Sequence, residues 1–343
     1  MTHVLNIGPT GRSRDFAGIA CVLIGMVFFV GQDALMKALL GPYTVWLLMA
    51  VRGAVAVLVL VPLILILGGR HRLLTPMWPL HLLRGALFAL GFSLFYSAFP
   101  FMGLAEVSTI FFAAPLITGL LAVVFLGERI GIHRMAALVI GFIGVLIAMA
   151  PSGDAFNWIA IMPLLCAIMY ATGQVLARVI GDRETTLTTG LHTILYCSLL
   201  VLPLGWGLNQ ILPMQGDFAH LGWTLPGAGQ HEWPKLLLLG AVGMAGYLLL
   251  SRAYQIAPAS LVAPFDYSYL PMATVMAWIL WAEVPGQNTW LGMVLIVSSG
   301  LYLGYRELLQ ARRADVPVST AETVFTPGSP GAHVASQTEA MDR

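Results

Sequence analysis

The chain has 343 residues, of which 58% are hydrophobic and only 10% are charged. Soluble domains carry about 25% charged residues, so this composition excludes an ordinary soluble protein and indicates a membrane protein that contacts the lipid bilayer. The formal net charge is +1 and the basic residues are dispersed along the chain, so we expect no nucleic acid among its partners.

Hydrophobic runs predict ten transmembrane helices, because a span needs about 20 apolar residues and ten of them fit this length. The expected spans cover residues 16–38, 43–67, 80–101, 106–126, 133–151, 156–179, 187–208, 234–254, 260–282 and 289–307. We expect an all-α integral membrane protein with a polar arm (1–14), two five-helix halves (15–151 and 155–307) and a disordered cytoplasmic tail (308–343). The one long loop between spans covers residues 209–233.

The arginines and lysines predict the orientation of these spans. With the N-terminus in the cytoplasm, all 17 basic residues except Lys37, Arg52 and Lys235 fall in cytoplasmic segments, as the positive-inside rule requires. We therefore expect both termini on the cytoplasmic side of a bacterial inner membrane. Because each half has an odd number of spans, the halves should be inverted relative to each other, as in many secondary transporters.

The two halves also share sequence. Gly31-Gln32 aligns with Gly173-Gln174, and the segment Ala105–Glu128 aligns with Ser260–Glu283. The loop after Glu128 is basic, whereas the loop after Glu283 has no lysine or arginine before the final span. Matching segments with opposite loop charge are what an inverted repeat predicts.

Several segments of both halves resemble one known family. They are His81–Gly85, Gly103–Ser108, Phe125–Arg129, Gly141–Val145, Ala257–Phe265 and Glu283–Gly286. Through them the chain, over residues 15–307, resembles the drug/metabolite transporter superfamily in its bacterial EamA-type branch. The resemblance implies a ten-span carrier, but members of this family carry substrates as different as amino acids, nucleotide-linked metabolites, cofactors and drugs. One departure is Ala282, which stands where the first half has Gly127.

Asp266 is the leading candidate for a substrate contact, because ionisable groups at membrane depth are costly and are therefore functional hypotheses. Pro264 and Pro271 flank it and predict a bent or broken helix, a frequent feature of transporter sites. Tyr267 and Tyr269 lie beside it and are expected to join the substrate cavity. The alternative is a structural pair of Asp266 with Arg84 or Arg252 that closes a cytoplasmic gate.

Three further charges lie within the first two spans. Arg52 could bind a carboxylate or phosphate of the substrate, or it could form an ion pair with Asp33. Asp33 and Lys37 are spaced i, i+4 and share one helix face. They are candidates for gating or coupling, either as a local ion pair at the rim or, as the family resemblance implies for Lys37, along the transport route.

Neutral polar groups complete the candidate site. Gln32 and Gln174 occupy equivalent positions in the two halves and could build a central polar site, or simply make an interhelical hydrogen bond. Tyr96, with the two tyrosines near Asp266, could stack on a flat ligand or attract a cation. The matched residues Glu128 and Glu283 are expected to cap or pair with loop groups at the membrane face.

These features favour a secondary transporter that moves a small organic metabolite by alternating access. One acid, one arginine and several tyrosines suit a zwitterion or a flat heterocycle, such as an adenosyl-methionine-like or vitamin-like metabolite or an amino acid. The alternatives are an intramembrane lipid-modifying enzyme or a channel, but no catalytic, metal-binding or cofactor-binding motif is present in the sequence. Protons are a candidate coupling ion, and the chain is expected to be a monomer or a homodimer.

Overall fold

The computed structural model describes residues 11–68, 73–126, 132–149, 158–212, 216–223, 233–257 and 259–314. Its α-helices are α1 (Gly11–Leu39), α2 (Val45–Leu67), α3 (Trp78–Ser97), α4 (Leu104–Phe111), α5 (Ala114–Leu126), α6 (Ile132–Met149), α7 (Ile161–Ile180), α8 (Thr186–Ile211), α9 (Trp233–Ile256), α10 (Ala259–Val262), α11 (Tyr269–Trp281) and α12 (Gln287–Ala314). Four short 3-10 helices, η1 (Trp158–Ala160), η2 (Gly181–Arg183), η3 (Gly216–Leu221) and η4 (Ala263–Ser268), complete the described elements.

The regular elements among the described residues are helices, and seven of the helical segments are long and apolar enough to cross a membrane. These segments are Asp15–Leu39, Val45–Leu67, Trp78–Ser97, Leu104–Phe125, Trp158–Ile180, Thr186–Ile211 and Trp233–Ile256. A shorter apolar segment, Met135–Met149, lies in α6. The chain is therefore a multi-pass membrane protein.

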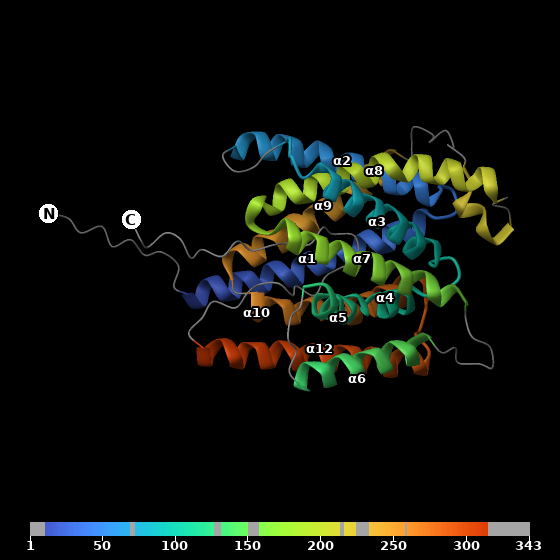
Figure 1. Cartoon of the computed structure of the whole chain (residues 1–343). Helices are drawn as coiled ribbons and strands as arrows, with labels where there is room; N and C mark the ends of the chain where they lie inside the picture. The colour runs from blue at the N-terminus through green and yellow to red at the C-terminus, as the bar shows by residue number, and fades with distance from the viewer. Residues whose placement is uncertain are drawn as a thin grey trace.

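The helices run side by side, and α1 begins at the same end of the bundle at which α12 ends (Figure 1). Helix α1 packs along α9, α3 packs on both α7 and α8, and α2 packs on both α8 and α9. Helices α6 and α12 lie together along one edge of the bundle (Figure 1). Glycine allows these two helices to approach closely. A Cβ atom added at Gly292 would lie only 2.5 Å from the carbonyl oxygen of Gly144.

Two of the expected spans are interrupted. The predicted break near Pro264 is confirmed, because α10 gives way to the 3-10 turn η4 before α11 begins. The expected span over residues 106–126 agrees with the apolar segment Leu104–Phe125, but its interruption was not predicted: α4 ends at Phe111 and α5 begins at Ala114. Phe112, which lies in this second break, aligns with Tyr267 of η4.

Some expected boundaries also differ. Helix α1 begins at Gly11, within the expected polar arm, and α12 continues to Ala314, within the expected disordered tail. The added residues of α12 include Leu308, Leu309 and Ala311, which are strong helix formers. The 3-10 helix η3 lies within the expected loop over residues 209–233.

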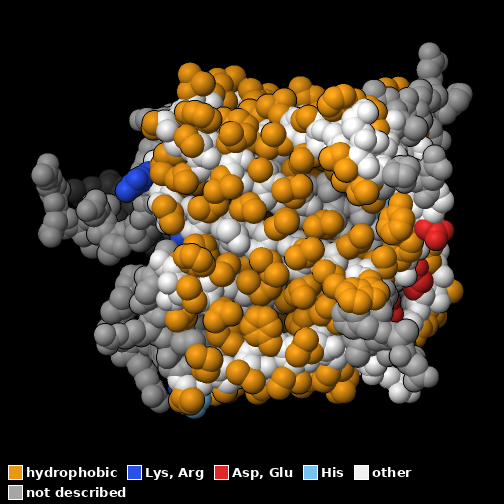
Figure 2. Space-filling view, turned by 45° about the vertical axis from the view of Figure 1, so that its right-hand side comes forward, with side chains coloured by type: hydrophobic (Ala, Val, Ile, Leu, Met, Phe, Trp, Pro, Cys, Tyr) orange, Lys and Arg blue, Asp and Glu red, His pale blue; other side chains and the backbone are white. Residues whose placement is uncertain are grey.

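Hydrophobic side chains cover most of the face in Figure 2, with basic side chains at one end and acidic side chains at the other. Large apolar residues such as Leu58, Ile66 and Val124 are more than half exposed. An apolar surface of this extent is expected where lipid, rather than water, surrounds the protein.

Candidate functional site

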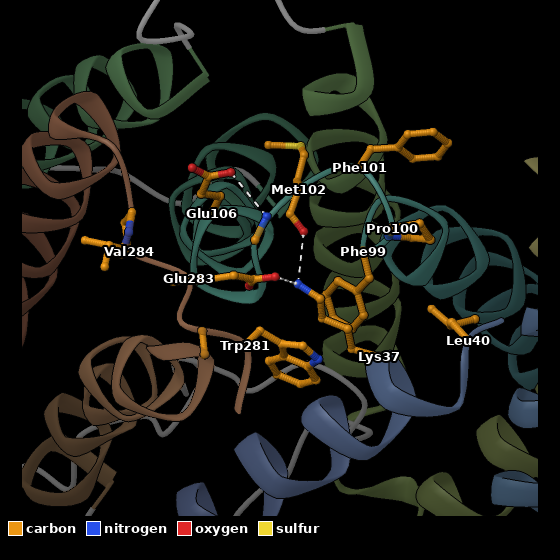
Figure 3. Close-up of a pocket in the computed structure, with 14 residues that line it drawn as sticks. Lys37, Leu40, Phe99, Pro100, Phe101, Met102, Glu106, Trp281, Glu283 and Val284 are labelled. Carbon is orange, nitrogen blue, oxygen red and sulfur yellow. Dashed lines mark hydrogen bonds and ion pairs between the residues drawn. The ribbon is translucent and has the colours of Figure 1, made fainter. Parts of the chain in front are cut away.

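A vestibule with a volume of about 380 Å³ opens at the end of the bundle where α1 finishes (Figure 3). Its lining includes Lys37 of α1, the Phe99–Glu106 segment between α3 and α4, and Trp281 and Glu283 at the end of α11. Ligand pockets usually have volumes of about 300–1,000 Å³, so this vestibule has room for a small metabolite.

An ion pair between Lys37 and Glu283 crosses the vestibule (Figure 3). The ammonium group of Lys37 also donates to the carbonyl of Met102 at 3.5 Å and lies 4.9 Å from the ring centroid of Trp281. The second carboxylate oxygen of Glu283 accepts a hydrogen bond from the backbone N–H of Leu104 at 3.3 Å. This one pair therefore links α1, the start of α4 and the end of α11.

The pairing of Lys37 corrects one expectation and agrees with another. A local Asp33–Lys37 pair does not form, because Lys37 reaches across to Glu283. Glu283 does pair with neighbouring groups, as expected, while Glu128 lies outside the described residues. The residue before Glu283, Ala282, adopts a left-handed backbone conformation with φ of 53°, which ends α11 without the usual glycine.

One helical turn before Lys37 on α1 lies a buried cluster that we call the Asp33 network. It is made of Gln32, Asp33, Arg52, Tyr96 and Tyr269. One carboxylate oxygen of Asp33 accepts from the Tyr96 hydroxyl at 3.0 Å and from Gln32 Nε2 at 3.3 Å. The other oxygen accepts from the Tyr269 hydroxyl at 2.6 Å. The Asp33 side chain is fully buried, so these donors replace the water that an ionised carboxylate requires.

Arg52 joins this network through Tyr96 rather than directly. Its Nη1 donates to the Tyr96 hydroxyl at 2.8 Å, and the same hydroxyl donates to Asp33. The expected direct Asp33–Arg52 pair is therefore replaced by a bridge through a tyrosine. The guanidinium also lies 5.9 Å from the ring centroid of Phe92, so the cation is placed among aromatic faces.

A second cluster, which we call the Arg84 group, consists of Arg84, Tyr170, Gln174, Tyr254 and Asp266. Arg84 lies in the second turn of α3, whereas Tyr96 lies in its last turn, so the backbones of these two residues are about 18 Å apart along this helix. Arg84 Nε donates to the carbonyl of Gly173 at 3.0 Å, and its Nη1 donates to the Thr193 hydroxyl at 2.9 Å. Both of these acceptors are neutral.

Asp266 is also fully buried, but its environment is poorer in donors. The Tyr254 hydroxyl donates to its Oδ2 at 2.8 Å, and no described residue forms a hydrogen bond with its Oδ1. The alternative of a structural pair with Arg84 or Arg252 does not form here, because neither arginine makes an ion pair with Asp266 within the described parts of the chain. Arg252 is exposed and donates to Gln255 at 3.5 Å.

The two glutamines line different cavities. Gln32 and Arg52 line one of about 30 Å³, and Gln174 and Arg84 line another of about 10 Å³. The side chain of Phe88 borders both cavities. Each arginine is thus accompanied by one of the two equivalent glutamines, with an aromatic ring between the two pairs.

The three tyrosines singled out from the sequence have different places. Tyr96 and Tyr269 belong to the Asp33 network, whereas Tyr267 packs against Phe112 at a ring-centroid distance of 5.7 Å. Tyr267 also faces α12, because a Cβ on Gly300 would lie 1.9 Å from its hydroxyl. Only a glycine at that position leaves room for this ring.

One contact of charged groups was missed in the sequence. Glu184, just before α8, lies 2.7 Å from Nε2 of the buried His81 of α3 and accepts a hydrogen bond from Thr75. The His81 ring stacks on His192 of α8 at a centroid distance of 5.1 Å. The available signal was the rarity of acidic residues, since Glu184 is one of only 16 in the chain. Nothing near Glu184 in the sequence indicates that His81 is its partner.

Charged side chains buried inside a helical membrane bundle are costly and indicate a functional site within the membrane. The sequence profile described as the EamA-like transporter family matches residues 16–150 and 157–304, and the chain belongs to this family. The protein is therefore a transporter.

Individual relatives are similar over most of their length. A riboflavin transporter of Vibrio cholerae is 29% identical over 268 residues, which cover 77% of this chain and 84% of the relative. An S-adenosylmethionine uptake transporter of Rickettsia felis is 26% identical over 239 residues, covering 70% of this chain and 76% of the relative. A solved crystal structure shares the fold with a TM-score of 0.55 and 20% identity, over 87% of this chain and 99% of that chain.

Proposed function

We propose that this protein is a secondary carrier that moves a small zwitterionic or flat heterocyclic metabolite across a bacterial inner membrane by alternating access. In this proposal its ten spans form two inverted five-helix repeats, and both termini lie in the cytoplasm. The observation that carries the proposal is that contacts between the two halves close the bundle at both ends, around buried charged groups.

Two observations support the inverted repeats. The family profile matches each half separately. The helices of the two halves also pack in equivalent ways. Helix α1 packs on α9 as its counterpart α7 packs on α3, and α2 packs on α9 as its counterpart α8 packs on α3. The interruptions between α4 and α5 and at η4 lie at aligned positions, which is the expected place for broken helices in such a carrier.

The closures at the two ends support alternating access. The Lys37–Glu283 pair joins the halves at the vestibule, and the contacts of Glu184 with His81 and Thr75 join them at the other end. The cavities between these closures, of about 30 and 10 Å³, are far smaller than a ligand pocket. A metabolite could therefore pass only if each closure opened in turn.

The substrate class is supported by the relatives and by the aromatic interior. Relatives named for riboflavin and for S-adenosylmethionine both handle molecules with a flat heterocycle. Phe88, Phe92, Phe111 and Tyr170 lie with ring centroids 4.5–6.3 Å apart in successive pairs, and such rings can stack on a heterocycle. Protons are the proposed coupling ion, since two buried carboxylates are available to carry them.

Counterflow in proteoliposomes tests the proposal and separates a carrier from a channel. Vesicles preloaded with unlabelled S-adenosylmethionine or riboflavin should take up the same labelled compound faster than empty vesicles do. Protein-free vesicles are the control. Equal uptake into preloaded and empty vesicles would contradict alternating access, because only a carrier returns faster when it is loaded.

A further inference from the structure

Arg84 carries a charge that is not neutralised within the described parts of the chain. Its side chain is 3% exposed, and its two hydrogen-bond acceptors, the Gly173 carbonyl and the Thr193 hydroxyl, are both uncharged. Glu184, a carboxylate near this end of α3, is already bound by His81 and Thr75. A guanidinium cannot shed its proton, so a buried one without an anion is costly unless a ligand supplies the anion.

A second unsatisfied donor lies beside Arg84. The Nε2 of Gln174 is buried and has no hydrogen-bond partner among the described residues. Gln174 and Arg84 line the same small cavity. Together they offer the charge and the N–H groups that a carboxylate or phosphate accepts.

Asp266 provides a second buried charge, of the opposite sign. Tyr170 lies within electrostatic reach of both Arg84 and Asp266. The carboxyl group of Asp266 has one donor, Tyr254, and a buried oxygen to which no described residue donates. Such an oxygen suits an ammonium group, which brings three N–H donors and a positive charge.

Resting on the carrier function proposed above, we infer that the Arg84 group binds the α-amino-acid head group of the substrate. Arg84 and Gln174 take the carboxylate, and Asp266 with Tyr254 takes the ammonium. A zwitterionic head group supplies an anion for Arg84 and Gln174 and a cation for Asp266. A neutral heterocycle without such a head group leaves the charge of Arg84 without an anion.

The rest of the substrate has a place beside this head-group site. Phe88 borders the cavity that Arg84 lines, and its ring lies 4.5 Å from that of Phe92 and 6.1 Å from that of Tyr170. A heterocycle joined to the head group would stack among these rings. The cavity itself is about 10 Å³, so the head group enters when the closure formed by Glu184 opens.

The test compares probes that differ in the head group. S-adenosylmethionine carries it, methylthioadenosine has the same nucleoside without it, and riboflavin has a different heterocycle without it; an amino-acid mixture has the head group alone. Counterflow and competition in proteoliposomes should favour S-adenosylmethionine over methylthioadenosine by at least tenfold. Arg84→Gln should reduce S-adenosylmethionine exchange at least tenfold, and Arg183→Gln, at an exposed arginine of η2, is the matched control that should not.

Asp266→Asn is the second variant, in case Arg84→Gln fails to fold, and it should also lose at least tenfold in S-adenosylmethionine exchange. The head-group inference is overturned, and the carrier function stands, if riboflavin or methylthioadenosine exchanges as well as S-adenosylmethionine does. It is equally overturned if both variants exchange S-adenosylmethionine at the wild-type rate. Folded protein that exchanges none of the four probes contradicts the proposed function itself.

Discussion

The Asp33 network and the Arg84 group are both buried at membrane depth, but only one of them is satisfied by its own residues. Asp33 has donors on both oxygens, and Arg52 reaches it through Tyr96. In the Arg84 group, Asp266 Oδ1 and Gln174 Nε2 have no partner among the described residues. Burial alone therefore does not separate a structural cluster from a binding site, whereas the satisfaction of its hydrogen bonds does.

This difference leads us to interpret the two clusters differently. A network whose charges and donors match holds helices together, and losing one member should destabilise the fold. A group with an uncompensated cation gains its partners from outside, so losing a member should affect transport more than stability. The variants below test this distinction, and the largest expected effect comes first.

Removing the cation of the Asp33 network should have the largest effect on stability. Arg52→Gln removes the positive charge that reaches the buried Asp33 carboxylate through Tyr96. Leaving a buried charge uncompensated costs about 3–5 kcal/mol. We expect a marked fall in the unfolding temperature of the detergent-purified protein. A variant that melts like the wild type would mean that Asp33 and Arg52 do not stabilise the fold together.

Removing one hydroxyl should have a smaller effect. Tyr269→Phe deletes the 2.6 Å hydrogen bond to Asp33, and hydrogen bonds to charged groups contribute about 1.5–3 kcal/mol. Denaturant or thermal unfolding should detect this loss. Tyr305→Phe, at an exposed tyrosine of α12, is the matched control and should leave stability unchanged.

The ion pair at the vestibule should matter less for stability. The side chains of Lys37 and Glu283 are 11% and 31% exposed, and partly exposed pairs contribute about 0–1 kcal/mol and weaken with salt. Lys37→Gln should therefore lower the unfolding temperature slightly at low ionic strength and less at high ionic strength. A large loss of stability that salt does not change would mean that Lys37 and Glu283 behave as a buried ion pair.

Acid should weaken the protein slightly at the vestibule end. His220 of η3 contacts the carbonyl of Ser97 at 3.2 Å, and burial lowers the pKa of His220 below its ordinary value of 6.5. The unfolded chain then binds this proton more readily than the folded chain does, so stability is present above pH 6.5 and falls as the pH drops below it. His220→Gln should reduce the loss of thermal stability between about pH 7.5 and about pH 5.5, and an equal loss in both proteins would exclude His220 as its source.

The sequence identified the right kinds of residue better than it identified their partners. Asp33, Arg52 and Tyr96 were candidates because charged and aromatic groups at membrane depth are conspicuous in an apolar chain. Their bridge through the Tyr96 hydroxyl depends on how α1, α2 and α3 meet, and helical spacing within one segment cannot give that. The same reason explains why a local pair of Lys37 with Asp33, one turn away, was one of the two interpretations of Lys37.

Prolines mark both backbone breaks, but only one of the breaks was predicted. Pro264 predicted the interruption at η4, while the break after Phe111 became visible only in the structure. Pro115 was the available signal, because it has no N–H to donate to the carbonyl of Phe111. The alignment of Phe112 with Tyr267 was a second signal, because a repeat should break at equivalent places. The contrast between satisfied and unsatisfied clusters could not be predicted at all, because it depends on atoms from four or more helices.

The most direct test of this contrast is the thermal unfolding of three proteins, wild type, Tyr269→Phe and Arg84→Gln, with and without saturating S-adenosylmethionine. A ligand at about 100 times its dissociation constant stabilises the folded state by about 2.7 kcal/mol. We expect Tyr269→Phe to melt below the wild type and still be stabilised by the ligand. Arg84→Gln should melt near the wild type and lose that stabilisation. The reverse pattern, with Arg84→Gln unstable yet stabilised by the ligand, would contradict the assignment of the two clusters.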